Sequence, residues 1–306
     1  MKRLYEKINE LWARYRKWGE SSIIGDFTVS TVKGVLVSVL VLFLFYSLFI
    51  VGPFRDEEKP SQESSLSDSG DTAKDDCSVF GVILHGDLLT YIPYHSENNS
   101  FFDDSVASDY IVDIIKQANE DAEIKAILIE VDSGGGSAVA GEEISDAVKN
   151  SDKPIVAIIR GIGASGAYWA ISSADKIFAS KNSDVGSIGV TSSYLSSVEN
   201  NKKNGYVYEQ LSVGKFKDSG DPDKPLTNEE RSLFLRDINI IYENFIKAVS
   251  QNRKLSIADV RSFADGSTVL GEKAKSLGLI DEIGGMGEVE KYLEKTIGEK
   301  PEICWQ

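Results

Sequence analysis

The stretches AILIEVDSGGGS, residues 126–137, and IVAIIRGIGASGAYW, residues 155–169, share one plan. Each begins as a run of apolar, largely β-branched residues and ends in a turn rich in glycine. Apolar runs of this length are typical of strands that are buried on both faces of a parallel sheet. Ligands of such sheets bind beyond the carboxyl ends of the strands, so we expect both glycine-rich turns to line one site.

Further strands and helices are predicted on either side of these two stretches. We expect strands over residues 79–86 (VFGVILHG) and 177–180 (IFAS). Apolar residues recur at helical spacing over 111–118, and a short helix is expected over 142–149. This order predicts one α/β domain over residues 79–306, with a parallel sheet and flanking helices.

A long helix is predicted to begin after Thr227. Thr227 and Glu230 have the spacing of a capping box, and apolar residues then form one stripe from Phe234 to Val249. A stripe of this kind faces either the core of its own domain or another subunit.

A charge-free apolar run near the N-terminus predicts a membrane span. No charged residue occurs between Lys33 and Arg55, and the sequence GVLVSVLVLFLFYSLFIV occupies residues 34–51. A helix of this length crosses the roughly 30 Å hydrocarbon core of a bilayer. The run is longer than the apolar part of a cleaved signal peptide, so we expect an uncleaved transmembrane helix over residues 34–52.

The flanks of this predicted helix set its orientation. Residues 1–33 hold seven basic and four acidic side chains, whereas the sequence RDEE follows the span at residues 55–58. The positive-inside rule therefore predicts that residues 1–33 are a cytoplasmic tail and that the rest of the chain lies outside. Residues 53–78 are rich in Ser, Asp, Glu and Lys, which predicts a flexible linker.

The overall composition argues against several kinds of partner. The net charge of −15 disfavours nucleic acid, because phosphate binding needs clustered Lys and Arg. With two histidines and two cysteines that lack CxxC spacing, no metal site and no cofactor are expected. For Cys77 and Cys304, free thiols are the favoured interpretation. A disulfide between them stays open, since it requires that this part of the chain lies in an oxidising compartment.

The glycine-rich turn over residues 161–166, GIGASG, formally fits the dinucleotide pattern GxGxxG. The helix expected behind it is too short for a dinucleotide-binding unit, so we reject this interpretation. Residues 163–167, GASGA, nearly fit the GxSxG turn around a nucleophilic serine, here Ser165. That turn normally precedes its histidine, whereas His85 and His95 both come earlier in the chain.

A nucleophilic serine without a histidine can use a lysine as its base. The amine must then be neutral, which requires desolvation or nearby positive charge. Lys215 and Lys217 both lie in LSVGKFKD, residues 211–218, and spacing does not choose between them.

Five sequence blocks together resemble the short form of the signal peptide peptidase A family, also called protease IV, within the ClpP/crotonase-like fold. The blocks are DSGGGS (132–137), GASGAYW (163–169), GSIGV (186–190), VGKFKD (213–218) and GEKAKSLGLIDEIGG (271–285). The chain departs from the family at two positions, where Gly134 replaces a proline and Ala167 replaces a glycine.

The resemblance implies roles for individual residues. Ser165 matches the nucleophile, and Lys217 matches the general base. Ser187 matches a serine that orients this lysine. The backbone N–H groups of Gly135 and Gly166 match an oxyanion hole, which stabilises the charge that develops on the substrate oxygen.

The same resemblance selects Lys217 over Lys215 and implies a function. It implies a membrane-anchored serine endopeptidase with a Ser–Lys dyad, which degrades residual signal peptides and other membrane or exported proteins. Similar proteins form homo-octamers in which the dyad is built across a subunit boundary. The implied location is the bacterial inner membrane, crossed once, with the catalytic domain outside the cytoplasm.

Three other functions stay open. The first is a related membrane Ser–Lys protease that acts on stomatin-like partners. The second is a crotonase-like acyl-CoA enzyme, whose oxyanion hole also uses two amides, although the predicted anchor and Ser165 argue against it. The third is an inactive assembly scaffold. Labelling by a serine-reactive fluorophosphonate probe, with Ser165→Ala as control, separates a protease from the last two.

The predicted orientation can be tested on spheroplasts. External protease is expected to release a fragment that begins within residues 53–80, because the linker is the unstructured part outside the membrane. Mass spectrometry of the released fragment checks this. Full protection of the domain, with loss of the N-terminal tail alone, would reverse the orientation.

Overall fold

The computed structural model describes residues 77–92 and 104–305. The chain divides into two units, Met1–Asp71 and Thr72–Gln306, and all of the described residues belong to the second. The predicted tail over 1–33, the predicted membrane helix over 34–52 and nearly all of the predicted linker lie outside the described residues. Within the described part, no helix is both long and apolar enough to cross a bilayer.

The sheet of this domain is built from nine strands in the described residues. Their bounds are β1 Val79–Leu89, β2 Ser105–Ala107, β3 Ala126–Gly136, β4 Ile155–Ala164, β5 Lys176–Ala179, β6 Asp184–Gly186, β7 Thr268–Leu270, β8 Glu282–Ile283 and β9 Ile303–Trp305. The main order is β2-β1-β3-β4-β5-β8, while β6 pairs with β4 and β7, and β9 pairs with β1. Every pairing is parallel except that of β6 with β7. The four predicted strands are therefore confirmed as β1, β3, β4 and β5.

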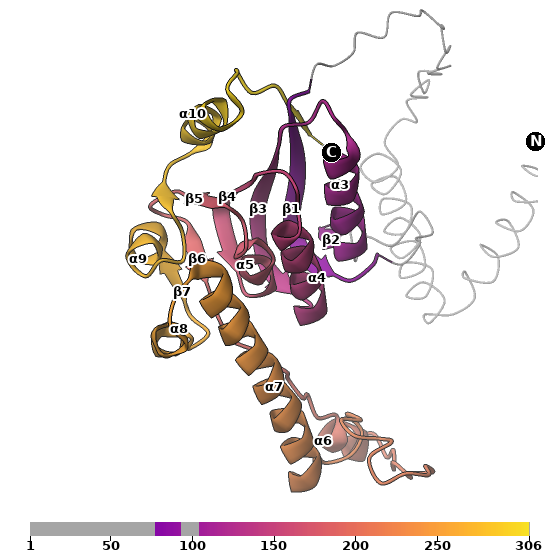
Figure 1. Ribbon diagram of the computed structural model, residues 1–306. Coiled ribbons are helices and arrows are strands. Elements are labelled where there is room, and N and C mark those ends of the chain that lie inside the picture. The colour runs from indigo at the N-terminus through magenta and orange to yellow at the C-terminus, as the bar shows by residue number, and fades with distance from the viewer. Residues whose placement is uncertain (1–76, 93–103, 306) are drawn as a thin grey trace, which may run out of the picture. The chain divides into compact units, whose positions relative to one another are not determined.

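Helices cover both faces of the sheet (Figure 1). Their bounds are α3 Ser108–Glu120, α4 Ala138–Lys149, α5 Gly166–Ile171, α6 Val198–Lys203, α7 Asn228–Arg253, α8 Ile257–Phe263, α9 Gly271–Ser276 and α10 Met286–Ile297. The larger core lies between the sheet and α3, α4, α5 and the C-terminal part of α7, and α10 packs on the opposite face.

Strand β4 shows why its sequence is an uninterrupted apolar run. Ile155, Ala157 and Ile159 face the larger core, whereas Val156 and Ile158 face the smaller core beneath α10. All five side chains are fully buried, because successive residues of a strand point to opposite faces and both faces are covered. The predicted parallel α/β domain is confirmed by this arrangement.

Helix α7 begins as predicted. The side chain of Thr227 accepts a hydrogen bond from Glu230 N, and Glu230 Oε2 accepts one from Thr227 N at 2.9 Å. This reciprocal pair satisfies two backbone donors at the start of the helix.

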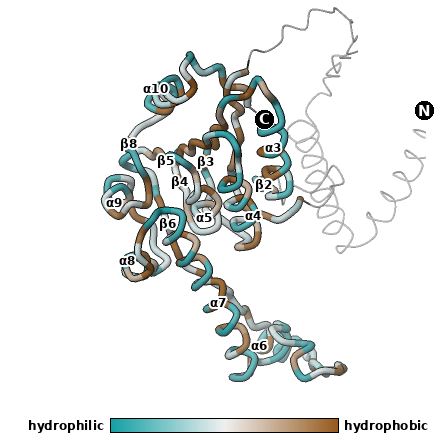
Figure 2. Tube along the Cα trace, in the orientation of Figure 1, coloured by the Kyte–Doolittle hydropathy of each residue, from teal (hydrophilic) through white to brown (hydrophobic). Residues whose placement is uncertain are grey.

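The apolar stripe on α7 is most deeply buried in its C-terminal half, where Phe245 and Val249 are 2% and 0% exposed, while its N-terminal members are half-buried. Away from the stripe, Leu235 and Ile240 are 51% and 54% exposed. In Figure 1 the N-terminal half of α7 runs away from the sheet, beside α6 and the segment that joins them. Figure 2 shows brown, apolar residues recurring along this half as well. The helix therefore has more apolar surface than its own domain covers.

A disulfide joins Cys77 to Cys304, whose Cα atoms are 5.8 Å apart. The favoured interpretation of free thiols is therefore wrong. The cysteines meet because β9 pairs in parallel with the start of β1, and Glu302 N donates to Ser78 Oγ at 3.0 Å beside them. The bond ties the beginning of the domain to its C-terminal strand.

Loss of this disulfide is expected to lower the free energy of unfolding by about 3–5 kcal/mol, because it closes a very long loop in the unfolded chain. Denaturant unfolding of the fragment 77–306, with and without dithiothreitol, measures the difference. The Cys77→Ser/Cys304→Ser variant is the control: it should match the reduced protein and be insensitive to the reductant. Identical curves for the parent protein in both conditions, with the thiols confirmed as reduced, would contradict this expectation.

Candidate active site

Ser165 stands at the sharp turn between β4 and α5. Its φ of 52° and ψ of −127° are rare for a residue with a side chain and cost about 1–3 kcal/mol, which surrounding contacts must offset. Ser165 N donates to Gly186 O at 2.7 Å, and Ser165 O accepts from Trp169 N at 2.9 Å. These bonds hold the turn so that the side chain lines a cavity.

The two glycine-rich turns meet at Ser165, as the sequence predicted. Gly135 has a φ of 103°, and a Cβ atom added to it would lie 2.8 Å from both Ser165 Cβ and Gly166 N. Only a glycine permits this approach, since real Cβ atoms do not come so close to other heavy atoms. The predicted nucleophile and both predicted oxyanion glycines therefore lie together.

The N–H group of Gly135 is already engaged. It donates to Ser133 Oγ at 3.1 Å, and Ser133 Oγ donates in turn to Gly86 O at 2.6 Å. Gly136, which was not among the predicted donors, lines the cavity together with Ser165 and Gly166. The run of three glycines offered a signal for it, but the letters do not show which amide faces the cavity.

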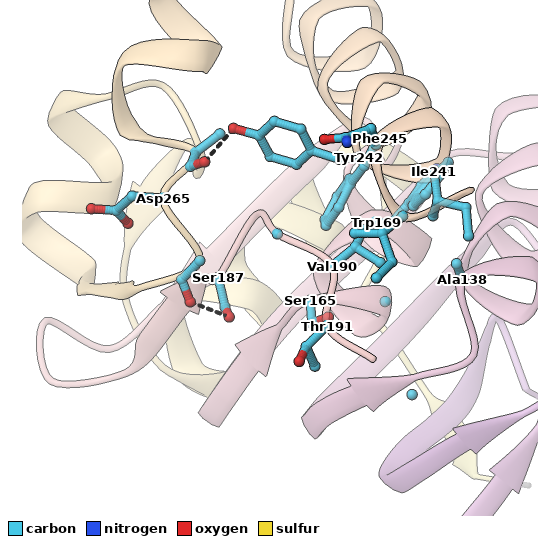
Figure 3. A pocket seen from close by; sticks show the side chains of 17 residues that line it. Ala138, Ser165, Trp169, Ser187, Val190, Thr191, Ile241, Tyr242, Phe245 and Asp265 are labelled. Carbon is cyan, nitrogen blue, oxygen red and sulfur yellow. Dashed lines mark hydrogen bonds between the residues drawn. The ribbon is translucent and has the colours of Figure 1, made fainter. Parts of the chain in front are cut away.

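The cavity beside Ser165 has a volume of about 720 Å³, and apolar side chains form one part of its wall (Figure 3). Trp169 of α5 and Phe245 of α7 stack there with their ring centroids 4.8 Å apart and their planes at 10°. The other apolar side chains that line the cavity are Ala138, Val190, Ile238, Ile241, Tyr242 and Ala264. Such a wall suits an apolar side chain of a ligand next to the serine.

Ser187 lines the same cavity and also has a positive φ, of 49°. Its hydroxyl donates to Gly266 O at 2.7 Å, and its N–H donates to Ser267 O at 3.0 Å. Tyr242 of α7 holds the same loop through a hydrogen bond from its hydroxyl to Ala264 O. The loop between α8 and β7 is thus fixed from two sides, as the dashed lines in Figure 3 show.

Neither candidate lysine lines this cavity. Both lie in the exposed segment between α6 and α7, next to the end of α7 that runs away from the sheet (Figure 1). Lys215 Nζ forms an ion pair with Glu229 Oε1 at 2.7 Å, whereas Lys217 has no carboxylate partner within the described part of the chain. A single chain does not bring Lys217 to Ser165.

His85 lies away from the cavity, on β1. Its Nε2 is 3.2 Å from Glu130 Oε1, and Arg160 pairs with the other oxygen of Glu130 at 2.7 Å. His95 lies outside the described residues. No histidine of residues 77–92 and 104–305 lines the Ser165 cavity, and no cluster of metal-binding side chains occurs in these ranges.

Two protein families match the chain over this site. Residues 147–299 match peptidase family S49, and residues 97–185 match the Clp protease family. The chain belongs to peptidase family S49. The S49 match contains Ser165, Ser187 and Lys217.

Three relatives of this S49 peptidase carry the names of proteases or peptidases. A protease of Methanocaldococcus jannaschii is 35% identical over 216 residues, which is 70% of each chain. Protease 4 of Haemophilus influenzae is 30% identical over 207 residues, 67% of this chain and 34% of that protein. A signal peptide peptidase SppA of Enterococcus faecium is 30% identical over 202 residues, 65% of this chain and 59% of that protein.

Membership of S49 decides between several of the predictions. The resemblance to the signal peptide peptidase A family and the ClpP-like α/β fold are confirmed. The chain is a serine peptidase by family, so the acyl-CoA enzyme is wrong.

The glycine turn of this S49 peptidase can be tested by a matched pair of substitutions. Gly136→Ala is expected to destabilise the domain by roughly 2–3 kcal/mol and to abolish activity, because the new methyl group would lie 2.2 Å from Leu88 O. Gly134→Ala should leave stability unchanged, since no atom lies within 4 Å of the added group. Denaturant melts and fluorophosphonate labelling measure both effects. A Gly136→Ala protein with normal stability and labelling would refute the crowding seen at this turn.

Proposed function

We propose that this chain is a membrane-anchored S49 endopeptidase in which Ser165 attacks the peptide bond and Lys217 of a neighbouring copy is the general base. One observation carries the proposal. Ser165 lines a cavity that no histidine of the described residues lines, while Lys217 is exposed in the segment between α6 and α7.

The proposed reaction is acyl transfer through the serine. The Lys217 amine takes the proton from Ser165 Oγ as this oxygen attacks the carbonyl carbon. The N–H groups of Gly166 and, in place of Gly135, Gly136 stabilise the resulting oxyanion. The C–N bond then breaks, the leaving amine receives the proton from the lysine, and water hydrolyses the acyl-enzyme by the same steps.

Ser187 is suited to orient the incoming amine. Its hydroxyl hydrogen is donated to Gly266 O at 2.7 Å. The lone pairs of its oxygen are therefore left to accept an N–H of Lys217. This supports the predicted role of Ser187 without requiring it to change partner.

The choice of Lys217 over Lys215 is supported by their contacts. Lys215 is paired with Glu229 at 2.7 Å, so its amine is already engaged. A base must be neutral when it takes the proton, and Lys217 lacks a carboxylate partner among the described residues.

Exposed apolar side chains on the lysine-bearing segment support a covering subunit. Val207, Leu211 and Val213 of this segment are 91%, 88% and 98% exposed, and Leu195, which precedes α6, is 86% exposed. Burial of these side chains by another copy would also desolvate Lys217, which favours its neutral form. We therefore propose a homo-oligomer, an octamer by the family resemblance, in which each site combines two copies.

The proposed substrates are signal peptides left in the membrane and other membrane or exported proteins. The apolar wall of Trp169 and Phe245 suits such sequences, and the predicted span over 34–52 would keep the enzyme near them. The Cys77–Cys304 disulfide supports a domain outside the cytoplasm, where such bonds persist. The proposed location is the bacterial inner membrane, with the N-terminus inside.

Mixing of inactive variants tests the shared site. Ser165→Ala and Lys217→Ala should each lower peptidase activity by about 10²–10⁴-fold or more, and Lys217→Arg should be equally inactive because arginine stays charged. When the Ser165→Ala and Lys217→Ala proteins are dissociated and reassembled together, activity should return in part, since some sites then hold both residues. Lys215→Ala is the matched control and should stay within a few-fold of the parent.

Two results would overturn this proposal. The base would be another residue if Lys217→Ala kept near-normal turnover. The dyad would lie within one chain if the mixed assembly stayed inactive while a mixture of parent and Ser165→Ala subunits assembled normally.

A further inference from the structure

The loop that carries Lys217 is held by side chains as well as by its own turns. Lys217 N donates to Gly214 O at 3.1 Å, and Asp221 N donates to Asp218 O at 3.2 Å. From the preceding segment, Tyr208 OH donates to Asp218 Oδ2 at 2.7 Å. The residue directly after Lys217 is therefore a carboxylate whose position is fixed by a tyrosine.

Four other carboxylates between Lys217 and the first turn of α7 also accept hydrogen bonds or form ion pairs within the domain. Asp221 Oδ1 accepts from Asp223 N at 2.8 Å, and Asp223 Oδ1 accepts from Asn201 Nδ2 of α6 at 2.7 Å. From α7, Glu229 pairs with Lys215, and the buried Glu230 pairs with Lys224. The remaining charged side chain of the segment before Lys217 is Glu209.

This distribution of partners leaves Lys217 without an ion pair inside the described chain. A carboxylate within about 4–6 Å of an amine favours its charged form, and the charged form cannot act as a base. Asp218 is the carboxylate next to Lys217 in the chain, and within the described residues it forms no ion pair with Lys217, while its Oδ2 is engaged by Tyr208.

The Tyr208 hydroxyl donates to this carboxylate in its protonated form. The hydrogen bond to Asp218 is the main cause that raises the pKa of Tyr208 to about 12. The hydroxyl therefore remains a donor at neutral and mildly alkaline pH.

We infer that Tyr208 is a positioning residue for the general base: it keeps the Asp218 carboxylate turned away from Lys217. The inference rests on the proposed function, because it takes Lys217 as the base. Without the tyrosine hydroxyl, Asp218 is free to pair with Lys217 and hold it in the charged form. Neutral amine then forms only at higher pH, while the apolar cavity that binds substrate is unchanged.

Tyr208→Phe tests this inference in the assembled, full-length enzyme with a peptide substrate. At neutral pH kcat should fall about tenfold with KM nearly unchanged, and the acid limb of the pH–kcat profile should move up by roughly one pH unit. Tyr206→Phe is the matched control: Tyr206 is 70% exposed, and its hydroxyl makes no hydrogen bond within the described residues. Its profile should coincide with that of the parent.

A second substitution separates the charge effect from a loss of structure. Asp218→Asn in the Tyr208→Phe background removes the carboxylate, so the acid limb should return to the position of the parent. A merely structural role of Tyr208 would lower activity equally at all pH values and would not be rescued. If Tyr208→Phe fails to assemble, Asp218→Asn alone decides: it should stay active with its acid limb at the position of the parent, and a limb at lower pH would show that Asp218 already pairs with Lys217 and would refute the inference.

The outcomes that overturn the inference differ from those that overturn the proposed function. If Lys217→Ala is inactive but the profile of Tyr208→Phe coincides with that of the parent, only the role of Tyr208 is refuted. The same follows if assembled Asp218→Asn is inactive. If Lys217→Ala is active in this assay, both the base and its positioning residue are wrong.

Discussion

Gly135 approaches Ser165 and Gly166 so closely that any side chain at this position would overlap both of them. The approach follows from the parallel pairing of β3 with β4, which ends in the register of Ser133 with Gly163. It also needs the positive φ of Ser165, which is held by the bond from its N–H to Gly186 O. The strain at the serine is thus offset by the sheet around it. The contact between these two turns therefore positions the Ser165 hydroxyl and the Gly166 amide beside the cavity.

Helix α7 connects the parts of the site that lie far from this contact. Phe245 stacks on Trp169 in the cavity wall, and Tyr242 holds the loop that bonds Ser187. At its first turn, Glu229 pairs with the segment that carries Lys217. A helix of 26 residues is about 39 Å long. In the proposed assembly, one rigid element therefore sets the cavity of its own copy and presents the lysine to another.

Strand β9 is held on the sheet by a disulfide and a side-chain hydrogen bond, because its pairing with β1 is short. Strand β9 has only three residues, and its pairing with β1 is reinforced by the disulfide and by the bond from Glu302 N to Ser78 Oγ. A short edge strand of this kind is weak alone. The cross-link keeps the C-terminus on the sheet at the point where the predicted linker enters the domain.

The sequence by itself determined the elements whose burial is local. The apolar runs of β3 and β4 predict strands that are buried on both faces of the sheet. The start of α7 is predicted by its capping box, whose two residues are only three positions apart. The sequence also placed Ser165 at a tight turn, because glycines must flank a residue that approaches other backbone so closely.

Only the tertiary structure decided whether the Gly135 amide is already hydrogen-bonded, where Lys217 lies and whether the cysteines pair. The first depends on Ser133 Oγ engaging Gly135 N, a contact that no spacing shows. The position of Lys217 depends on the path of α7 away from the sheet. The disulfide depends on the pairing of β1 with β9, which brings together two cysteines 227 residues apart. The periodicity of a sequence indicates which residues of one helix or strand are buried. These three features instead depend on contacts between segments far apart in the sequence, which form only when the domain folds.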